Sequence, residues 1–340
     1  MRFQVIDVKY LKMMMKIILL LVTLTAVLLA GSSVYHHYQT KQDKEALLNY
    51  LGPNHHFIKT EAGTYSVYEK GSGHDVILFR EGLLTGSTIL DFMPLADALS
   101  KQYKVIMIDP LGYGLSSSAT TRRTDAAINQ EYHDILTKVT TEDDKITLIS
   151  HSISAAYTMD YIHRYPGMIS QVINIDGSRP WPGLKVTASS QPDHMDFAPV
   201  LNQLGLFRIG LSTEWGRSWS GYDKVLAEMT PLYDKELQQQ ITTLNKWAFL
   251  SGDMVQYSQE SNNNIAAVRG MKYPRDMRVL SVVASETVKE RPGWIRMQRT
   301  AFSNPGLQHT VELRGDHYLH HSAEALIEKI TEFDQHIQKD

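Results

Sequence analysis

The chain has 340 residues, of which 43% are hydrophobic and 21% charged, and it contains no cysteine. This composition is typical of a globular protein, and it excludes a disulfide scaffold, a thiolate metal site and a cysteine nucleophile. The 34 basic and 37 acidic residues give a net charge of −3, so overall charge offers no basis for binding nucleic acid.

The N-terminal segment is apolar and preceded by basic residues. The run Ile17–Ala30 contains no charged residue, and the next charge along the chain is Lys41. Spanning a bilayer takes about 20 apolar residues, a length reached only if residues 31–35 are included. We expect residues 1–35 to anchor the protein, with a cytoplasmic N-terminus and an extracytoplasmic body. The alternative is a cleaved signal peptide and a secreted protein, because Gly31-x-Ser33 resembles a processing site.

After a polar stalk at residues 36–54, running into a short helix, the pattern alternates between strands and helices. The predicted strands are Phe57–Thr60, Thr64–Glu69, Val76–Phe79, Val105–Ile108, Ile146–Ile149, Val172–Ile175, Val279–Val283 and Thr310–Leu313. The predicted helices between and after them are Ile89–Ser100, Thr124–Thr140, Ala155–Arg164 and Ser322–Gln338. Such alternation predicts an α/β fold with a mostly parallel sheet covered on both faces.

One long interruption breaks this rhythm. Between the sixth and seventh predicted strands, Asp196–Leu211 and Lys235–Ala267 have helical spacing, and Gly183–His194 reads as a loop. We interpret residues 178–275 as a helical cap inserted into a core formed by residues 55–177 and 276–340. The alternative is a separate domain.

The strand–turn–helix of Lys145–Pro166 carries the most chemical information. Its strand runs directly into Ser150-His151-Ser152-Ile153-Ser154, and a helix follows at once. This is the context of a nucleophile elbow, G-x-S-x-G, in which a tight turn lifts a serine above the sheet. Both glycines are replaced here by Ser150 and Ser154. Taken alone, the segment equally fits an ordinary turn with a serine at a helix N-terminus.

Two further segments match in order. Val76–Ser87 is a buried strand followed by a glycine-containing loop, and Val105–Ser116 ends in a D-x-x-G-x-G-x-S turn. Together with the elbow, they resemble the α/β-hydrolase superfamily over roughly Phe57 to Phe333. The resemblance implies the α/β-hydrolase fold, with an inserted helical cap.

The resemblance also implies a set of catalytic residues. Ser152 is the expected nucleophile and His317, in the sequence G-D-H after the last strand, is the expected base. The backbone N–H groups of Leu83 and Ile153 are the expected oxyanion hole. His320 and His321 are expected to be surface residues.

The acid that orients the histidine is open between two residues. Glu286, which follows the strand after the cap, is preferred, and Asp176, directly after the preceding strand, is the alternative. Glu81 stands where the superfamily usually has histidine, and we expect it to point away from the oxyanion hole or to pair with Arg80.

A serine nucleophile with a histidine base implies acyl transfer to water, through an acyl-enzyme formed from a small-molecule ester. No metal and no organic cofactor is expected, and the only other partner expected is the membrane, through the N-terminal segment. Epoxide-hydrolase-like members need a carboxylate at the elbow, so Ser152 argues against that activity. The alternatives are an aminopeptidase-like acyl hydrolase and a non-catalytic binding module, the latter suggested by Ser150, Ser154 and Glu81.

The expected cap is rich in large apolar residues. They include Trp181, Phe197, Trp215, Trp219 and Trp247. We expect most of them to pack the cap onto the core, and the alternative is that they line an acyl pocket.

Overall fold

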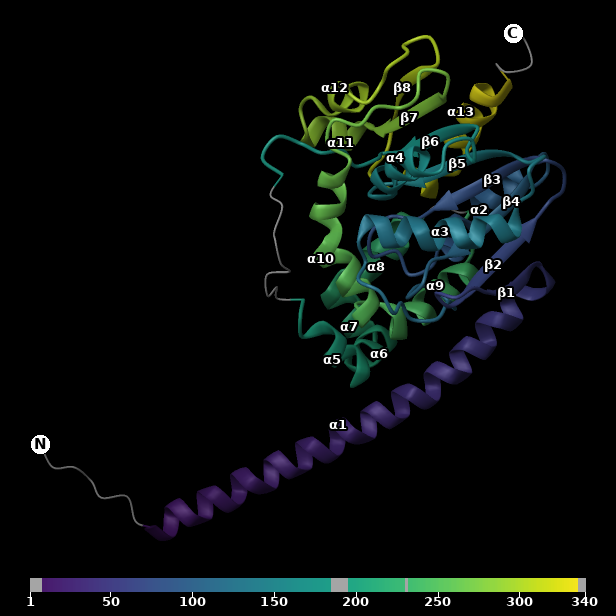
Figure 1. Ribbon diagram of the computed structural model, residues 1–340. Coiled ribbons are helices and arrows are strands. Elements are labelled where there is room, and N and C mark those ends of the chain that lie inside the picture. Colours follow the sequence, from purple (N-terminus) through teal and green to yellow (C-terminus); the bar gives the residue numbers. More distant parts are fainter. Residues whose placement is uncertain (1–7, 185–194, 230–231, 336–340) are drawn as a thin grey trace, which may run out of the picture.

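The protein is built around one eight-stranded sheet (Figure 1). A computed structural model describes residues 8–184, 195–229 and 232–335. The strand order is β1-β2-β4-β3-β5-β6-β7-β8; β2 is antiparallel to both β1 and β4, and all other neighbours are parallel. The strands are β1 His55–Lys59, β2 Thr64–Lys70, β3 Asp75–Arg80, β4 Lys104–Asp109, β5 Lys145–His151, β6 Gln171–Ile175, β7 Arg278–Ala284 and β8 Gln308–Leu313. All eight predicted strands are therefore confirmed, and so is the mostly parallel sheet.

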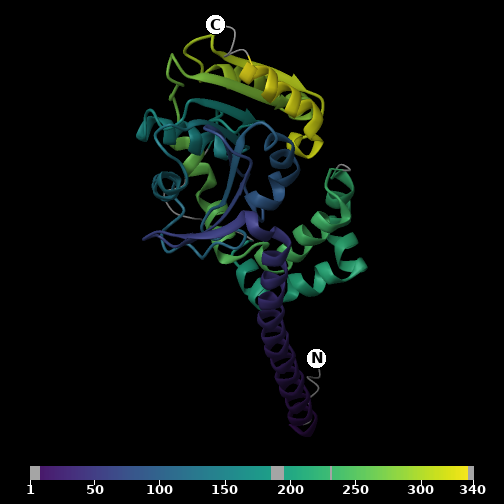
Figure 2. The ribbon, with the colours of Figure 1, turned by 90° about the vertical axis from the view of Figure 1, so that its right-hand side faces the viewer.

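Helices cover both faces of this sheet (Figure 2). α2 and α13 contact each other on one face, and α3 and α4 contact each other on the other. The bounds are α2 Thr88–Leu99, α3 Asp125–Val139, α4 Ser154–Arg164 and α13 Ala323–Gln335. Two short helices after β7, α11 Ser285–Glu290 and α12 Trp294–Arg299, were not predicted. Residues 336–338 of the last predicted helix lie outside the described residues.

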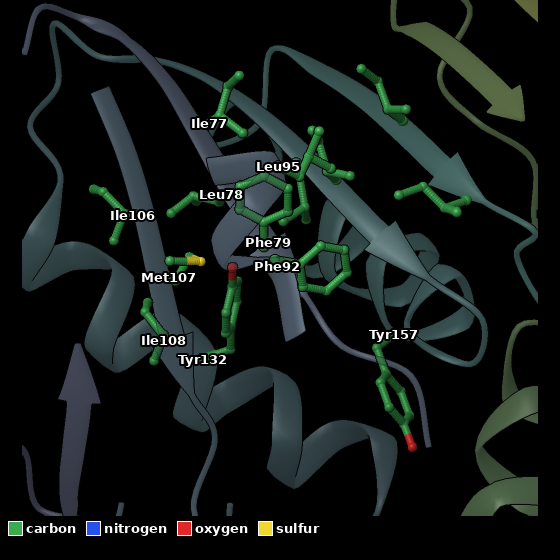
Figure 3. Close-up of a cluster of buried hydrophobic side chains, with 14 of the residues drawn as sticks. Ile77, Leu78, Phe79, Phe92, Leu95, Ile106, Met107, Ile108, Tyr132 and Tyr157 are labelled. Carbon is green, nitrogen blue, oxygen red and sulfur yellow. The ribbon is translucent and has the colours of Figure 1, made fainter. Parts of the chain in front are cut away.

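The core lies on both faces of the central strands, against α2 on one face and against α3 and α4 on the other (Figure 3). Ile77, Leu78 and Phe79 of β3 are each at most 2% exposed. Strands covered on both faces bury successive side chains, which explains why the sequence here is apolar without alternation. The ring of Phe92 on α2 stacks on Phe79 at 4.8 Å and on His320, in the turn after β8, at 4.6 Å. The core therefore extends to the segment that follows His317.

A single long helix, α1 Val8–Leu51, precedes the sheet and projects from the body (Figure 1). It is long and apolar enough to cross a membrane, with a mean hydropathy of 2.5 over its apolar stretch. The segment at residues 36–54, expected to be a polar stalk running into a short helix, is helical from its start, because α1 continues unbroken to Leu51 and ends in the short turn η1 Gly52–Asn54. Leu47 and Leu51 are buried, so packing against the body stabilises the polar half of this helix.

Helices fill the long insertion between β6 and β7, here called the inserted helices. They are α5 Ala198–Gln203, α6 Leu206–Ser212, α7 Glu214–Ser220, α8 Tyr222–Glu228, α9 Lys235–Ala248 and α10 Gly252–Ala267. Each of the two predicted helical stretches is broken in two, the first at Gly205, whose φ of 74° is left-handed. Positions 185–194 of the predicted loop lie outside the described residues.

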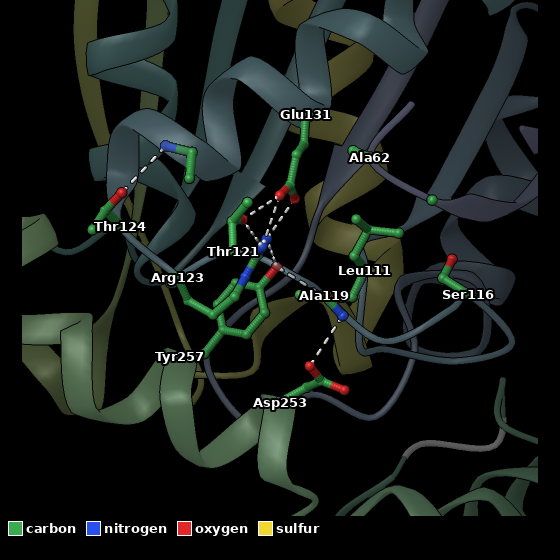
Figure 4. A network of polar contacts seen from close by, with 12 residues as sticks. Ala62, Leu111, Ser116, Ala119, Thr121, Arg123, Thr124, Glu131, Asp253 and Tyr257 are labelled. Carbon is green, nitrogen blue, oxygen red and sulfur yellow. Dashed lines mark hydrogen bonds and ion pairs between the residues drawn. The ribbon is translucent and has the colours of Figure 1, made fainter. Parts of the chain in front are cut away.

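A buried ion pair in the core is hydrogen-bonded to the inserted helices (Figure 4). The two terminal nitrogens of Arg123 donate to the two carboxylate oxygens of Glu131 on α3, at 2.9 and 2.7 Å. Arg123 also donates to the hydroxyl of Tyr257 on α10, at 2.8 Å. Arg123 is fully buried, so its charge depends on these partners.

Removing one partner of this pair should destabilise the fold. We expect Glu131→Gln to lower the free energy of unfolding by about 3 kcal/mol, because the Arg123 charge stays buried without its counter-ion. Urea denaturation of the full-length protein measures the change. The control is Asp97→Asn, which breaks the exposed pair with Lys70 and should cost less than about 1 kcal/mol. Equal losses in the two variants would contradict this account.

Candidate active site

Ser152 occupies a sharp bend between β5 and α4. Its φ is 54°, in the left-handed region that residues other than glycine rarely adopt. The backbone N–H of Ser152 donates to the carbonyl of Ile175, which ends the neighbouring strand β6, at 3.0 Å. Such strain persists only where the surrounding structure fixes it, and it occurs mostly at functional sites.

The two serines that replace the glycines of the elbow pattern both make buried hydrogen bonds. Ser150 Oγ donates to Asn174 Oδ1 on β6 at 2.8 Å. Ser154 Oγ donates to the backbone carbonyl of Glu81, in the loop after β3. The two hydroxyls therefore connect the elbow to β6 and to the loop after β3. These hydrogen bonds give serine a role at two positions where the elbow pattern has glycine.

His317 links Ser152 to an acidic residue. Its Nε2 lies 2.9 Å from Ser152 Oγ, and its Nδ1 lies 2.7 Å from Asp176 Oδ2. Because a carboxylate only accepts hydrogen bonds, Nδ1 carries the proton and Nε2 is left to accept from the serine hydroxyl. The structure thus brings Ser152, His317 and Asp176 into one hydrogen-bonded chain.

The structure brings Asp176, and not the preferred Glu286, to the ring of His317. Helix α11 begins directly after β7 and leaves Glu286 exposed in its first turn, where only the backbone N–H contacts the histidine loop, at Gly315 O. The same helix aims Thr287 inward, and its hydroxyl donates to Asp176 Oδ2 at 2.6 Å. Asp176 itself is fully buried and has a φ of 43°, directly after β6.

Hydrogen bonds from several donors stabilise the negative charge on the Asp176 carboxylate. Besides Thr287 and His317, the indole N–H of Trp294 and the backbone N–H of Ala284 donate to Oδ1, at 2.9 and 3.2 Å. Burial opposes ionisation, but these hydrogen bonds outweigh it and hold the pKa of Asp176 below its usual value. Sequence reasoning missed Thr287 and Trp294 because both lie on the short helices that it did not predict.

The loop after β3 passes directly beside the elbow. A Cβ on Gly82 would come within 2.6 Å of the His151 ring and 3.3 Å of Ser152 Cβ, so this approach requires glycine. Among the described residues, no protein acceptor takes a hydrogen bond from the N–H of Leu83 or of Ile153. The placement fits the expected oxyanion hole, which stays a prediction.

Glu81 does not pair with Arg80. Its carboxylate is buried and accepts from the hydroxyl of Thr88, at the start of α2, at 2.7 Å. Burial raises the pKa of Glu81, which favours its neutral form. Arg80 donates instead to Asn129 and packs on the ring of Tyr132.

A histidine cluster supports the segment after His317. His320 and His321 each hold one oxygen of Asp91, at 2.9 and 3.0 Å. The prediction that His320 is a surface residue is wrong, because it is fully buried under Phe92. His151 Nε2 donates to the backbone carbonyl of His317 at 3.0 Å, which also fixes this segment.

The same cluster is where the described residues come closest to a metal-ligand set. The ligand atoms of Asp91, His320 and His321 lie within 4.8 Å of one another. Burial opposes ionisation of Asp91, but the two histidines outweigh it and hold the pKa of Asp91 below its usual value. The carboxylate therefore accepts hydrogen bonds from the two rings, and the cluster fixes the position of the loop that carries His317.

The sequence has recognisable relatives. A model of the alpha/beta hydrolase family matches residues 64–329. The uncharacterized protein YbdG of Bacillus subtilis is 28% identical over 143 residues, and the 2-(acetamidomethylene)succinate hydrolase of Mesorhizobium japonicum is 32% identical over 126 residues. These alignments cover 42% and 36% of this chain and 42% and 43% of the two proteins, so the chain spans less than half the length of these curated relatives.

Solved structures share the fold. The Cif epoxide hydrolase from Acinetobacter nosocomialis superposes with a TM-score of 0.62 at 17% identity, over 86% of this chain and 95% of that chain. The thioesterase domain from the curacin biosynthetic pathway superposes with a TM-score of 0.54 at 17% identity, over 82% of this chain and 98% of that one. At these identities the similarity establishes the architecture alone.

The two candidate acids are distinguishable by substitution. We expect Asp176→Asn to slow labelling of the protein by a fluorophosphonate probe about 10⁴-fold, because the amide no longer fixes the tautomer of His317. The matched control, Glu286→Gln, should label at the wild-type rate. The labelling rate of the purified, folded variants measures both, and the reverse order of rates would overturn the assignment of Asp176.

Proposed function

Because the chain belongs to the alpha/beta hydrolase family, we propose that it is a serine hydrolase that cleaves a carboxylic ester or a related acyl bond. The observation that carries this proposal is the hydrogen-bonded chain Ser152–His317–Asp176, with distances of 2.9 and 2.7 Å. A serine hydroxyl needs an adjacent base to act as a nucleophile, and the base needs an orienting partner.

In the proposed first step, Ser152 Oγ attacks the carbonyl carbon of the ester while His317 Nε2 takes the hydroxyl proton. The C=O electron pair moves to oxygen, and the N–H groups of Leu83 and Ile153 stabilise the oxyanion. When the intermediate collapses, the C–O bond to the alcohol breaks and the His317 imidazolium returns its proton to the leaving alkoxide. The acyl group then remains on Ser152.

In the second step, His317 removes a proton from a water molecule, which attacks the acyl carbon. Collapse releases the carboxylic acid and returns the proton to Ser152. Throughout, Asp176 holds Nδ1–H and stabilises the imidazolium, and its depressed pKa keeps it ionised for this purpose.

The elbow residue supports acyl transfer over epoxide opening. The Acinetobacter neighbour is an epoxide hydrolase, and the family resemblance implies a carboxylate at the elbow for that activity. This chain has Ser152 there, held at 2.9 Å from a histidine. This difference at the elbow supports acyl transfer as the proposed chemistry.

The domain organisation and location belong to the same proposal. We infer that residues 178–275 act as a cap over the core and that α1 anchors the protein in a membrane with the body extracytoplasmic. The support is the position of the inserted helices between β6 and β7 and the apolar stretch of α1.

Substitution of the nucleophile tests the function. We expect Ser152→Ala to lower hydrolysis of p-nitrophenyl esters by about 10⁶-fold, the scale of losing a serine nucleophile. Ser170→Ala, which removes an exposed hydroxyl in the turn before β6, is the matched control and should keep full activity. Spectrophotometric rates of p-nitrophenolate release measure both.

The same assay separates the alternatives. Faster cleavage of aminoacyl-anilides than of esters, still dependent on Ser152, would identify a peptidase-like acyl hydrolase. A folded wild-type protein that cleaves neither class and does not react with a fluorophosphonate would contradict the hydrolase proposal and favour a binding module.

A further inference from the structure

The first inserted helices expose large apolar side chains. Phe197, Trp215 and Trp219 are 73%, 75% and 79% exposed. The sequence predicted that such residues pack onto the core or line an acyl pocket, and at this exposure these three do neither. Trp215 and Trp219 lie one turn apart on α7 with their rings stacked at 6.1 Å. We call these residues, with Val200, Leu201, Leu206 and Ile209, the apolar surface of α5–α7. Exposed patches of this kind mark interaction sites.

Helix α1 is docked on the same helices. Ser32 Oγ donates to the carbonyl of Leu204 at 2.7 Å, and Ser33 Oγ donates to that of Gln203 at 2.9 Å. Gly205 allows this approach, since a Cβ there would lie 2.8 Å from His36 Cβ. The turn between α5 and α6 thus lies directly against α1.

A buried arginine fixes the orientation of this contact. Arg208 on α6 donates to Asp43, Thr40 and His36 of α1, at 2.7, 2.9 and 3.2 Å. Its side chain is only 6% exposed, so the three hydrogen bonds hold α6 on α1 in one geometry.

This contact fixes the position of the apolar surface along α1, and so its depth relative to a membrane that α1 would span. The uncharged stretch of α1 reaches the length of a bilayer only if it continues to residues 31–35, and Ser32 and Ser33 are where α5–α6 touch it. Figures 1 and 2 show α5–α7 on the side of the body from which the apolar part of α1 projects. Tryptophan is enriched at this boundary between hydrocarbon and water.

We propose that the apolar surface of α5–α7 docks into the interfacial layer of the membrane that α1 spans. The inference rests on the proposed anchor. A lipid interface is the occupant that the structure favours, because Leu204 and Gly205, between α5 and α6, lie against α1, an apolar helix whose own large side chains are also exposed. The inserted helices are then held at the lipid surface, so the hydrolase meets acyl compounds that partition into it.

The absence of cysteine from the chain makes a clean test possible. Trp215→Cys and Trp219→Cys are made separately in the full-length protein, reconstituted in phosphatidylcholine–phosphatidylglycerol vesicles and labelled with an NBD fluorophore. Leu24→Cys, in the apolar stretch of α1, is the reference within the bilayer. Glu328→Cys, at an exposed position of α13, is the matched control. Figure 1 shows α13 on the opposite side of the body from the apolar part of α1. All four replaced side chains are exposed, so the fold does not depend on them.

We expect nitroxide-labelled lipid to quench the probes at positions 24, 215 and 219, while the probe at position 328 keeps its emission. Quenching at 24 without quenching at 215 and 219 would overturn the docking and leave the anchor standing. No quenching at 24 would overturn both. If the NBD probes at 215 and 219 are not quenched, and the unlabelled cysteine variants form disulfides between chains when a copper–phenanthroline oxidant is added, a second copy covers the surface and the docking is overturned. Fluorophosphonate labelling of Ser152 in the same vesicles reports separately on the proposed hydrolase function.

Discussion

The hydrogen bond between buried Asp176 and His317 is the constraint on which the site depends. A buried carboxylate is stable only if donors surround it, and here they come from β7, α11, α12 and the histidine itself. These donors lie on elements that are far apart in the sequence, so satisfying one charge fixes how they assemble. The short helices after β7 are part of the site for this reason.

The register of the sheet places the other partners. In the parallel ladder, His151 at the end of β5 is paired with Ile175 at the end of β6. The next residue on each strand is Ser152 or Asp176, and both turn away from the sheet with positive φ. Two adjacent carboxyl ends thus present the hydroxyl and the carboxylate side by side, in the region where open α/β sheets bind ligands.

Contacts with helix α2 in the core hold the segment from His317 to His321 in place. Phe92 stacks on both Phe79 and His320, and Asp91, one residue earlier, holds His320 and His321. Burial and the neighbouring rings of His320 and His317 keep the pKa of His151 well below its usual value, so this ring adds no positive charge beside Ser152. Helix α2 therefore connects the packing of the sheet to the position of the imidazole.

The sequence predicted the strands, the family, the elbow and the approach of His317 because these depend on local pattern and on spacing along one sheet. It preferred Glu286, whose side chain does not reach His317, because strand order alone allows either Glu286 or Asp176 as the partner of the histidine. Helix α11 makes the difference, because its first turn exposes the side chain of Glu286 to solvent and directs the hydroxyl of Thr287 toward Asp176. It also did not predict that Trp215 and Trp219 are exposed. A large apolar residue on a helix is expected to be buried in the core, and the sequence does not show which surface the helix packs against.

The most direct measurement of the central claim is peptide mapping by mass spectrometry after the wild-type protein has reacted with a slowly turned-over p-nitrophenyl ester. The account predicts a single acyl adduct on the peptide that contains Ser152, and none in the same peptide of a His317→Ala variant. An adduct on another residue, or equal acylation in the variant, would contradict it.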